Sequence, residues 1–149
     1  MNGKKQPYRP RRGKNQFGWI LIHSDKEFGD GHKYKTPQHE LEESYEPGIK
    51  WQWRWGQPLR EDEGPFSLLF AWEKRVFGYG TASVTRSVDS EDYNFAFVLD
   101  HYEERKPVAL ADLGLGKRST KHHGLIRLDS KILELYSRLS SCGPVFLPK

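Results

Sequence analysis

The chain has 149 residues, of which 36% are hydrophobic, 13% aromatic and 30% charged. This length predicts one domain with a real core, and five Trp, seven Tyr and eight Phe exclude a chain that is disordered throughout. No window approaches the roughly 18 apolar residues of a membrane-spanning helix, and the N-terminus lacks the apolar stretch of a signal peptide. A single cysteine, Cys142, excludes an internal disulfide, so we expect a reducing, cytoplasmic setting.

The net charge of +4 is concentrated at the N-terminus. Residues 1–14 contain six basic and no acidic residues, whereas the remainder of the chain has a net charge of −2. Basic arms bind phosphates by releasing counterions, although the same composition also serves as a solubilising tail. We expect residues 1–15 to be a disordered arm, 16–139 the folded domain, and 140–149 a tail or linker. The phosphate contacts predicted in the arm are Arg9, Arg11, Arg12 and Lys14.

The first half of the chain predicts a buried strand, a short helix and an alternating strand. Residues 17–23 form an apolar run with β-branched and aromatic members, which indicates a buried strand. Thr36 followed by Pro37 is typical of a helix N-cap and first turn, so we expect a helix over residues 37–44. After a turn at Glu46-Pro47-Gly48, residues 49–55 alternate strictly between apolar and polar, as in a half-buried strand.

The second half predicts three more strands and a closing helix. Residues 66–72 and 76–85 are apolar strands joined by a charged tripeptide, which indicates a hairpin, and residues 93–103 form a further strand. Residues 107–115 suit a strand end with a helical turn. Asp129 is expected to cap a last helix, with Leu128, Ile132, Leu135 and Leu139 at helical spacing. The order predicts an α+β, mostly β fold: a small barrel of five to six strands with two or three short flanking helices.

The run Trp51-Gln52-Trp53-Arg54-Trp55 is the most unusual feature of the sequence. In an extended strand the three indoles lie on one face, with Gln52 and Arg54 on the other. Such a row of Trp is either core or a wall on which a nucleic-acid base stacks, and stacking is worth about 1–3 kcal/mol per base. We expect a mixture, in which some indoles are buried and at least one contacts a base.

Gly78-Tyr79-Gly80 lies within a predicted strand. Two glycines at i and i+2 leave one face bare, so that another element or a ligand can approach closely. Strand alternation then places Phe77, Tyr79 and Thr81 on the opposite face.

Further polar residues are candidates for ligand contacts. Ser24 and Asp25 follow the first strand and offer the donor and acceptor pattern that reads a base edge, although Ser-Asp is also an ordinary turn. A basic loop supplies three more candidate phosphate contacts, and the alternative is a solvated loop. These are Lys117, Arg118 and Lys121.

Enzyme and metal motifs are missing from the sequence. There is no glycine-rich phosphate loop, no GxSxG, no HExxH and no paired-cysteine zinc motif. Asp129-Ser130-Lys131 has a spacing seen in some nucleases, but an aspartate is also expected there as a helix cap. We therefore expect a binding domain without catalytic residues, cofactor or metal.

From residue 66 onward the order of elements resembles the PUA-like superfamily, and within it the EVE type. The resemblance rests on the hairpin SLLFAWEKRVFGYGTASV, the strand NFAFVLDHYEERKPVALADL and the closing GLIRLDSKILELYSRL, and the opening GWILIHSD is similar to the family's first strand. It spans most of residues 17–139, whereas residues 27–63 fit the family pattern poorly.

The resemblance implies a small β-barrel whose relatives, including YTH and SRA domains, hold a flipped, modified base in an aromatic cage. Carried onto this chain, it implies base contacts by Ser24, Asp25, Trp51, Trp53, Trp55 and Trp72. The expected function is therefore a modified-base reader, with DNA favoured over RNA, that serves as the recognition module of a modification-dependent restriction system with a separate effector. The alternatives are an RNA-binding module of the same fold, a small nucleic-acid hydrolase with unrecognised carboxylates, and a protein-interaction domain.

Overall fold

The computed structural model describes residues 16–23, 33–53, 63–87, 95–115 and 124–140. Its elements are six strands, two α-helices and one 3₁₀ helix within these ranges. They are β1 (Gln16–Ile22), α1 (Pro37–Ser44), β2 (Ile49–Trp53), β3 (Glu63–Trp72), β4 (Arg75–Ser87), β5 (Phe95–Ala109), η2 (Leu110–Leu113), β6 (Gly124–Asp129) and α2 (Ser130–Leu139). The prediction of an α+β, mostly β fold with short flanking helices is confirmed.

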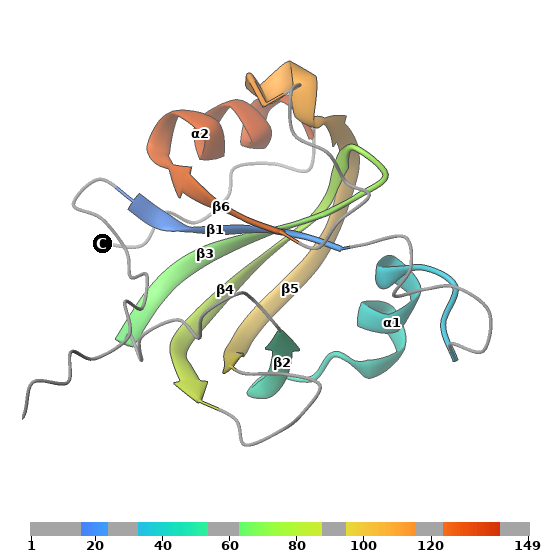
Figure 1. The fold of residues 1–149 in the computed structure, drawn as a ribbon, viewed down its shortest axis with the longest axis vertical. Coiled ribbons are helices and arrows are strands. Elements are labelled where there is room, and N and C mark those ends of the chain that lie inside the picture. Colours follow the sequence, from blue (N-terminus) through green and yellow to red (C-terminus); the bar gives the residue numbers. More distant parts are fainter. Residues whose placement is uncertain (1–15, 24–32, 54–62, 88–94, 116–123, 141–149) are drawn as a thin grey trace, which may run out of the picture.

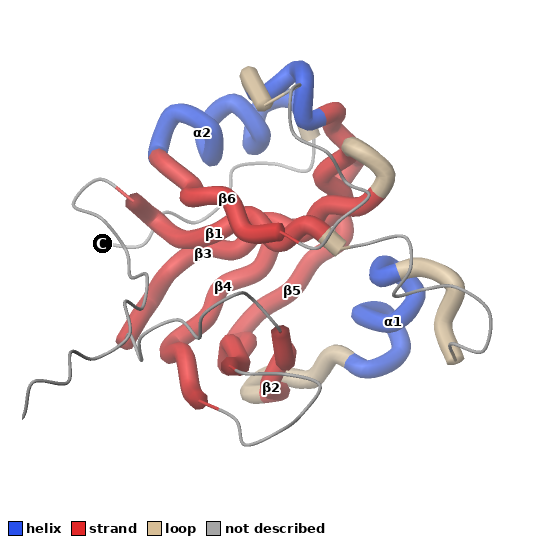
Figure 2. Tube along the Cα trace, in the orientation of Figure 1, coloured by secondary structure: helices blue, strands red, loops and turns tan. Residues whose placement is uncertain are grey.

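The strands form one strongly curved sheet in the order β2-β5-β4-β3-β1-β6 (Figures 1 and 2). Only β1 and β3 are paired in parallel; the other four pairings are antiparallel. Because β2 and β6 are the two ends of this order, the small barrel of five to six strands that the sequence predicted is present as a six-stranded half-barrel. The β3–β4 hairpin turns at Glu73 and Lys74, whose φ angles of 51° and 66° are those of a tight two-residue turn.

The curved sheet separates two apolar clusters. The concave cluster, which includes Trp19, Phe66, Leu68 and Phe97, also receives Leu41 from α1. The convex cluster contains Ile20, Leu69 and Tyr79 and is covered by η2 and α2. Strand alternation sends neighbouring residues of one strand, such as Leu68 and Leu69, into different clusters. The sheet is therefore buried on both faces.

The two helices are capped as the sequence predicted. Thr36 accepts a hydrogen bond from the backbone N–H of His39 at 3.1 Å, and Asp129 accepts one from that of Ile132 at 2.9 Å. The cap at Asp129 is the role that the sequence favoured for the aspartate of Asp129-Ser130-Lys131.

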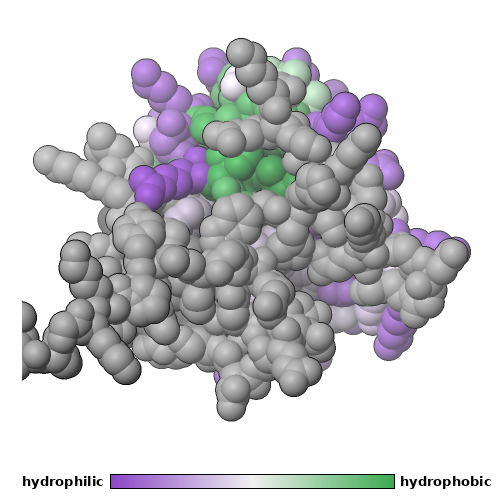
Figure 3. Space-filling view, viewed as in Figure 1, coloured by the Kyte–Doolittle hydropathy of each residue, from purple (hydrophilic) through white to green (hydrophobic). Residues whose placement is uncertain are grey.

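The apolar face predicted for α2 was partly wrong. The helix buries Leu133 and Tyr136, Ile132 and Leu135 are half-buried, and Leu139 is 40% exposed. Leu128 belongs to β6 rather than to the helical stripe. Figure 3 shows apolar residues gathered over this end of the molecule, among hydrophilic ones. None of the helices in the described ranges is long and apolar enough to cross a membrane.

Candidate functional site

An aromatic cluster surrounds a buried histidine on the concave face of the sheet. His23 is fully buried, and its ring centroid lies 4.8 Å from that of Trp53 and 6.0 Å from that of Trp51. Phe70 stacks with His23 at 6.3 Å, and Phe77 lies at 6.2 Å. We use the name aromatic cluster for these five residues: His23, Trp51, Trp53, Phe70 and Phe77.

The five members come from four parts of the sheet, and only Trp51 and Trp53 share a strand. His23 follows β1 and is fixed by its backbone N–H, which donates to the carbonyl of Ala71 at 2.9 Å. Period-two alternation in β2 buries Trp51 and Trp53 on one face and exposes Gln52 on the other, as predicted. Phe70 and Phe77 lie on β3 and β4, on either side of the hairpin. The cluster therefore assembles from three strands and a strand end that are distant in sequence.

The two glycines of Gly78-Tyr79-Gly80 make room for aromatic rings. A Cβ at Gly78 would lie 2.8 Å from the hydroxyl oxygen of Tyr102, and a Cβ at Gly80 would lie 3.2 Å from the ring of Phe70. The bare face of β4 is thus filled by Tyr102 and Phe70, which pack edge to face with ring centroids 5.4 Å apart.

The predicted facing of β4 was wrong at one position. Phe77 packs in the concave cluster, whereas Tyr79 packs in the convex cluster. The register between β3 and β4 shifts between Phe70 and Ala71, so β4 carries one extra residue there. This bulge breaks the alternation and turns Phe77 to the same face as the glycines.

Helix α1 lies next to β5 (Figure 1), and its Leu41 packs in the concave cluster. Leu41 is its fully buried anchor, and the Tyr45 hydroxyl donates to the backbone carbonyl of Asp100 at 2.9 Å. The ring of Tyr45 also lies 6.0 Å from that of Tyr102. A side-chain hydrogen bond between Glu42 and Glu104 joins the helix to β5 and, ahead of burial and charge repulsion, raises the pKa of Glu104.

The indole N–H of Trp51 and the hydroxyl of Tyr102 are buried at the aromatic cluster and have no hydrogen-bond partner among the residues that the structure describes. Burial, followed by the charge of Glu104, raises the pKa of Tyr102, so this hydroxyl stays protonated. Both groups are therefore available as donors.

Three of the six residues predicted to contact a base lie within the described part of the chain. Trp53 is 1% exposed and Trp51 is 7% exposed, whereas Trp72 is half-buried and packs against the concave cluster. Trp53 is thus a core residue in this conformation, and Trp72 retains the most accessible surface. Ser24, Asp25 and Trp55 lie outside the described residues. So do all the predicted phosphate contacts: Arg9, Arg11, Arg12, Lys14, Lys117, Arg118 and Lys121.

Sequence reasoning missed His23, Phe70, Phe77 and Tyr102 as members of this site. Phe70 and Phe77 were visible only as apolar strand residues, and the face on which Phe77 lies depends on the bulge. The glycines were a usable signal, because a bare strand face calls for a bulky neighbour, but the sequence does not say which one.

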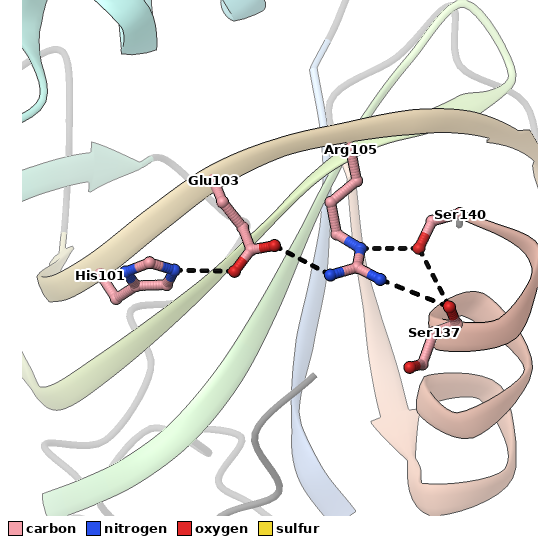
Figure 4. A network of polar contacts seen from close by, with 5 residues as sticks. All are labelled: His101, Glu103, Arg105, Ser137 and Ser140. Atoms are coloured by element: carbon pink, nitrogen blue, oxygen red, sulfur yellow. Dashed lines mark hydrogen bonds and ion pairs between the residues drawn. The ribbon is translucent and has the colours of Figure 1, made fainter. Parts of the chain in front are cut away.

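A second arrangement of polar groups lies along β5 (Figure 4). His101 contacts Glu103 at 2.8 Å, and Glu103 in turn accepts from Arg105 at 2.8 Å. The buried Arg105 guanidinium also donates to the Ser140 hydroxyl at 2.6 Å and to the Ser137 carbonyl at 3.3 Å. These bonds tie β5 to the C-terminal end of α2, which makes the network a structural clamp.

Among the described residues, no group of three or more His, Cys, Asp or Glu side chains could hold a metal ion. No family model matches the chain, and no match was found among curated proteins or among solved structures.

Proposed function

We propose that this chain is a nucleic-acid-binding domain of the PUA-like, EVE type, which takes up a single modified base of DNA against its aromatic cluster. The observation that carries the proposal is the gathering of Trp51, Trp53 and Phe70 around His23 on the concave face of a half-barrel. A base removed from its helix loses stacking and pairing, and aromatic rings in a protein can restore much of that energy.

The tryptophans that the structure describes have different roles in this proposal. Trp72 is half-buried and Trp51 keeps 7% of its surface, so these two are the surfaces on which a base would stack. Trp53 lies behind them, 1% exposed and edge-on to His23, and holds the wall in place. Because the wall is largely enclosed, the base would enter only after local rearrangement of the residues that cover it.

Discrimination between bases needs groups that read an edge, since stacking accepts any base. Ser24 and Asp25 follow His23 in the chain, and His23 is a member of the aromatic cluster. The proposal assigns edge reading to these two residues and phosphate contacts to the basic arm and basic loop. Phosphate contacts position a protein on its ligand but carry little sequence information.

The test is a binding panel at one fixed, moderate salt concentration. It uses single-stranded and duplex DNA and RNA oligonucleotides of one sequence, each with a central 5-methylcytosine, 5-hydroxymethylcytosine, N6-methyladenine or plain base. We expect one modified DNA to bind at least tenfold more tightly than its plain counterpart, a difference of about 1.4 kcal/mol.

Two results would overturn the proposal. Equal affinity for every modified and plain oligonucleotide would leave only non-specific phosphate binding. A modified RNA preferred over all DNA would favour the RNA-binding alternative. The same samples incubated with Mg²⁺ or Mn²⁺ should stay intact, and cleavage abolished by a carboxylate substitution would favour the hydrolase instead.

A further inference from the structure

The hydrogen-bond donors of Trp51 and Tyr102 are buried at the aromatic cluster without an acceptor among the described residues. The indole N–H of Trp51 and the hydroxyl of Tyr102 are both inaccessible to water, and neither has a partner in the described part of the chain. Trp51 is 7% exposed overall. Buried donors in native proteins are nearly always satisfied, because an unmade hydrogen bond carries the full cost of desolvation. Such donors at a candidate binding site therefore point to an acceptor that the described part of the chain does not supply.

The two donors share one neighbour. The ring of Trp51 meets Phe70 edge to face at 6.2 Å, and the ring of Tyr102 does so at 5.4 Å. The buried hydroxyl of Ser67, which also has no partner in the described residues, lies elsewhere. Its neighbours on β3, Phe66 and Leu68, face the concave cluster, so alternation directs Ser67 away from it. The rings that carry these two donors thus both pack against Phe70.

We infer that the base bound at the aromatic cluster carries an exocyclic carbonyl oxygen, and that Trp51 and Tyr102 donate hydrogen bonds to it. This inference rests on the proposed function and adds the substrate class. A carbonyl oxygen has two lone pairs and can accept from two donors at once, whereas each ring nitrogen of adenine accepts only one bond. Cytosine-, thymine- and guanine-type bases have such an oxygen, and adenine-type bases do not.

The surroundings of Tyr102 keep it a donor. Burial and the nearby carboxylates of Glu104 and Glu42 disfavour a tyrosinate, which could only accept. The hydroxyl also lies directly over Gly78, where no side chain can compete for it. Tyr45 provides a matched comparison, because its ring neighbours that of Tyr102 but its hydroxyl already donates to the carbonyl of Asp100.

The experiment compares Tyr102→Phe with Tyr45→Phe, first by thermal melting without ligand. Removing the Tyr102 hydroxyl breaks no hydrogen bond within the described part of the chain, so we expect the melting temperature of Tyr102→Phe to stay the same or rise. Removing the Tyr45 hydroxyl breaks a bond and should lower the melting temperature. A fall for Tyr102→Phe as large as that for Tyr45→Phe would show that the hydroxyl has a partner in the protein, and would overturn the inference.

The second measurement is binding of single-stranded DNA oligonucleotides with a central cytosine, 5-methylcytosine, thymine, guanine, adenine or N6-methyladenine. We expect the tightest ligand to have a carbonyl-bearing base, and Tyr102→Phe to weaken it about threefold to tenfold while adenine-type ligands change little. Tyr45→Phe should leave the ratio between the two classes unchanged.

The outcomes separate this inference from the proposed function. If an adenine-type base binds most tightly, or if Tyr102→Phe weakens both classes equally, the base is bound in another way and only the inference is wrong. If no oligonucleotide binds, the proposed function is wrong and the inference falls with it.

Discussion

The hydroxyl oxygen of Tyr102 lies so close to Gly78 that a Cβ atom on this glycine would stand 2.8 Å from it. The contact joins β4 to β5 on the concave side of the sheet and sets the depth at which the tyrosine ring packs against Phe70. The sequence marked Gly78-Tyr79-Gly80 only as a bare strand face. In the structure this face provides the space that the Tyr102 ring occupies.

We expect Gly78→Ala to destabilise the protein by about 1–3 kcal/mol, because the added methyl group forces the Tyr102 ring from its position. The measurement is the free energy of unfolding in urea. The control is the double variant Gly78→Ala with Tyr102→Leu, in which the smaller side chain relieves the collision. If the loss of stability in the double variant equals the sum of the losses in the two single variants, Gly78 is needed for a reason other than contact with the Tyr102 ring.

The clamp along β5 predicts that substitutions at its two ends, Arg105 and His101, lower the stability of the protein by different amounts. The Arg105 side chain is fully buried and that of Glu103 is 35% exposed, whereas the His101 side chain is 51% exposed. Arg105→Met removes the bonds to Ser140 and Ser137 and leaves Glu103 without its cation, so we expect a loss of about 3 kcal/mol. His101→Ala removes an exposed pair and should cost less than about 1 kcal/mol. Equal losses in urea unfolding would contradict this account of the network.

The contact between Glu42 and Glu104 predicts a pH dependence. The folded protein raises the pKa of Glu104, first through the hydrogen bond to Glu42, so the folded state retains a proton that the unfolded state has released. This contribution to stability is complete below the ordinary carboxyl pKa of 4.5 and is lost as the pH rises through the raised value. Amide exchange in α1 should therefore become faster as the pH increases above that point, after correction for intrinsic exchange.

Glu104→Gln should remove this dependence, because an amide keeps the hydrogen bond to Glu42 without a titrating proton. Glu46→Gln, at an exposed glutamate just beyond α1, is the matched control. If the wild-type protein and Glu104→Gln show the same corrected exchange from pH 4 to 8, the carboxyl pair does not hold the helix.

Measuring both the stability and the oligonucleotide affinity of each Trp→Ala variant distinguishes core tryptophans from those that contact a base. Trp53 is 1% exposed, so Trp53→Ala should cost about 3–5 kcal/mol of folding free energy. Trp72 is half-buried, and Trp72→Ala should cost less stability but remove stacking worth about 1–3 kcal/mol, which is roughly a fivefold to hundredfold loss of affinity. Melting curves and oligonucleotide titrations check both. Normal binding by a folded Trp72→Ala variant would exclude this residue from the base contact.

We predict that the basic arm makes the affinity for oligonucleotides depend on salt concentration but does not distinguish modified from plain bases. Deleting residues 1–14 removes six positive charges, so affinity should fall equally for modified and plain oligonucleotides. The slope of log affinity against log salt should also become shallower, because fewer counterions are released. An unchanged slope would show that the arm contacts no phosphates.

The sequence by itself determined the features that depend on neighbours along the chain. The caps at Thr36 and Asp129, the hairpin at Glu73 and Lys74, and the common face of Trp51 and Trp53 were all predicted and are all present. Each follows from local geometry: a side-chain oxygen within reach of an N–H group three residues on, or the two-residue period of a strand.

Only the tertiary structure decided which side chains meet. The parallel pairing of β1 with β3 brings His23 beside Ala71, and the extra residue in β4 turns Phe77 toward the aromatic cluster. Tyr102 fills the space over Gly78 although 24 positions separate them in the chain. Pairing register and bulges depend on the summed packing of a whole sheet, to which each residue contributes little, so no local pattern specifies them.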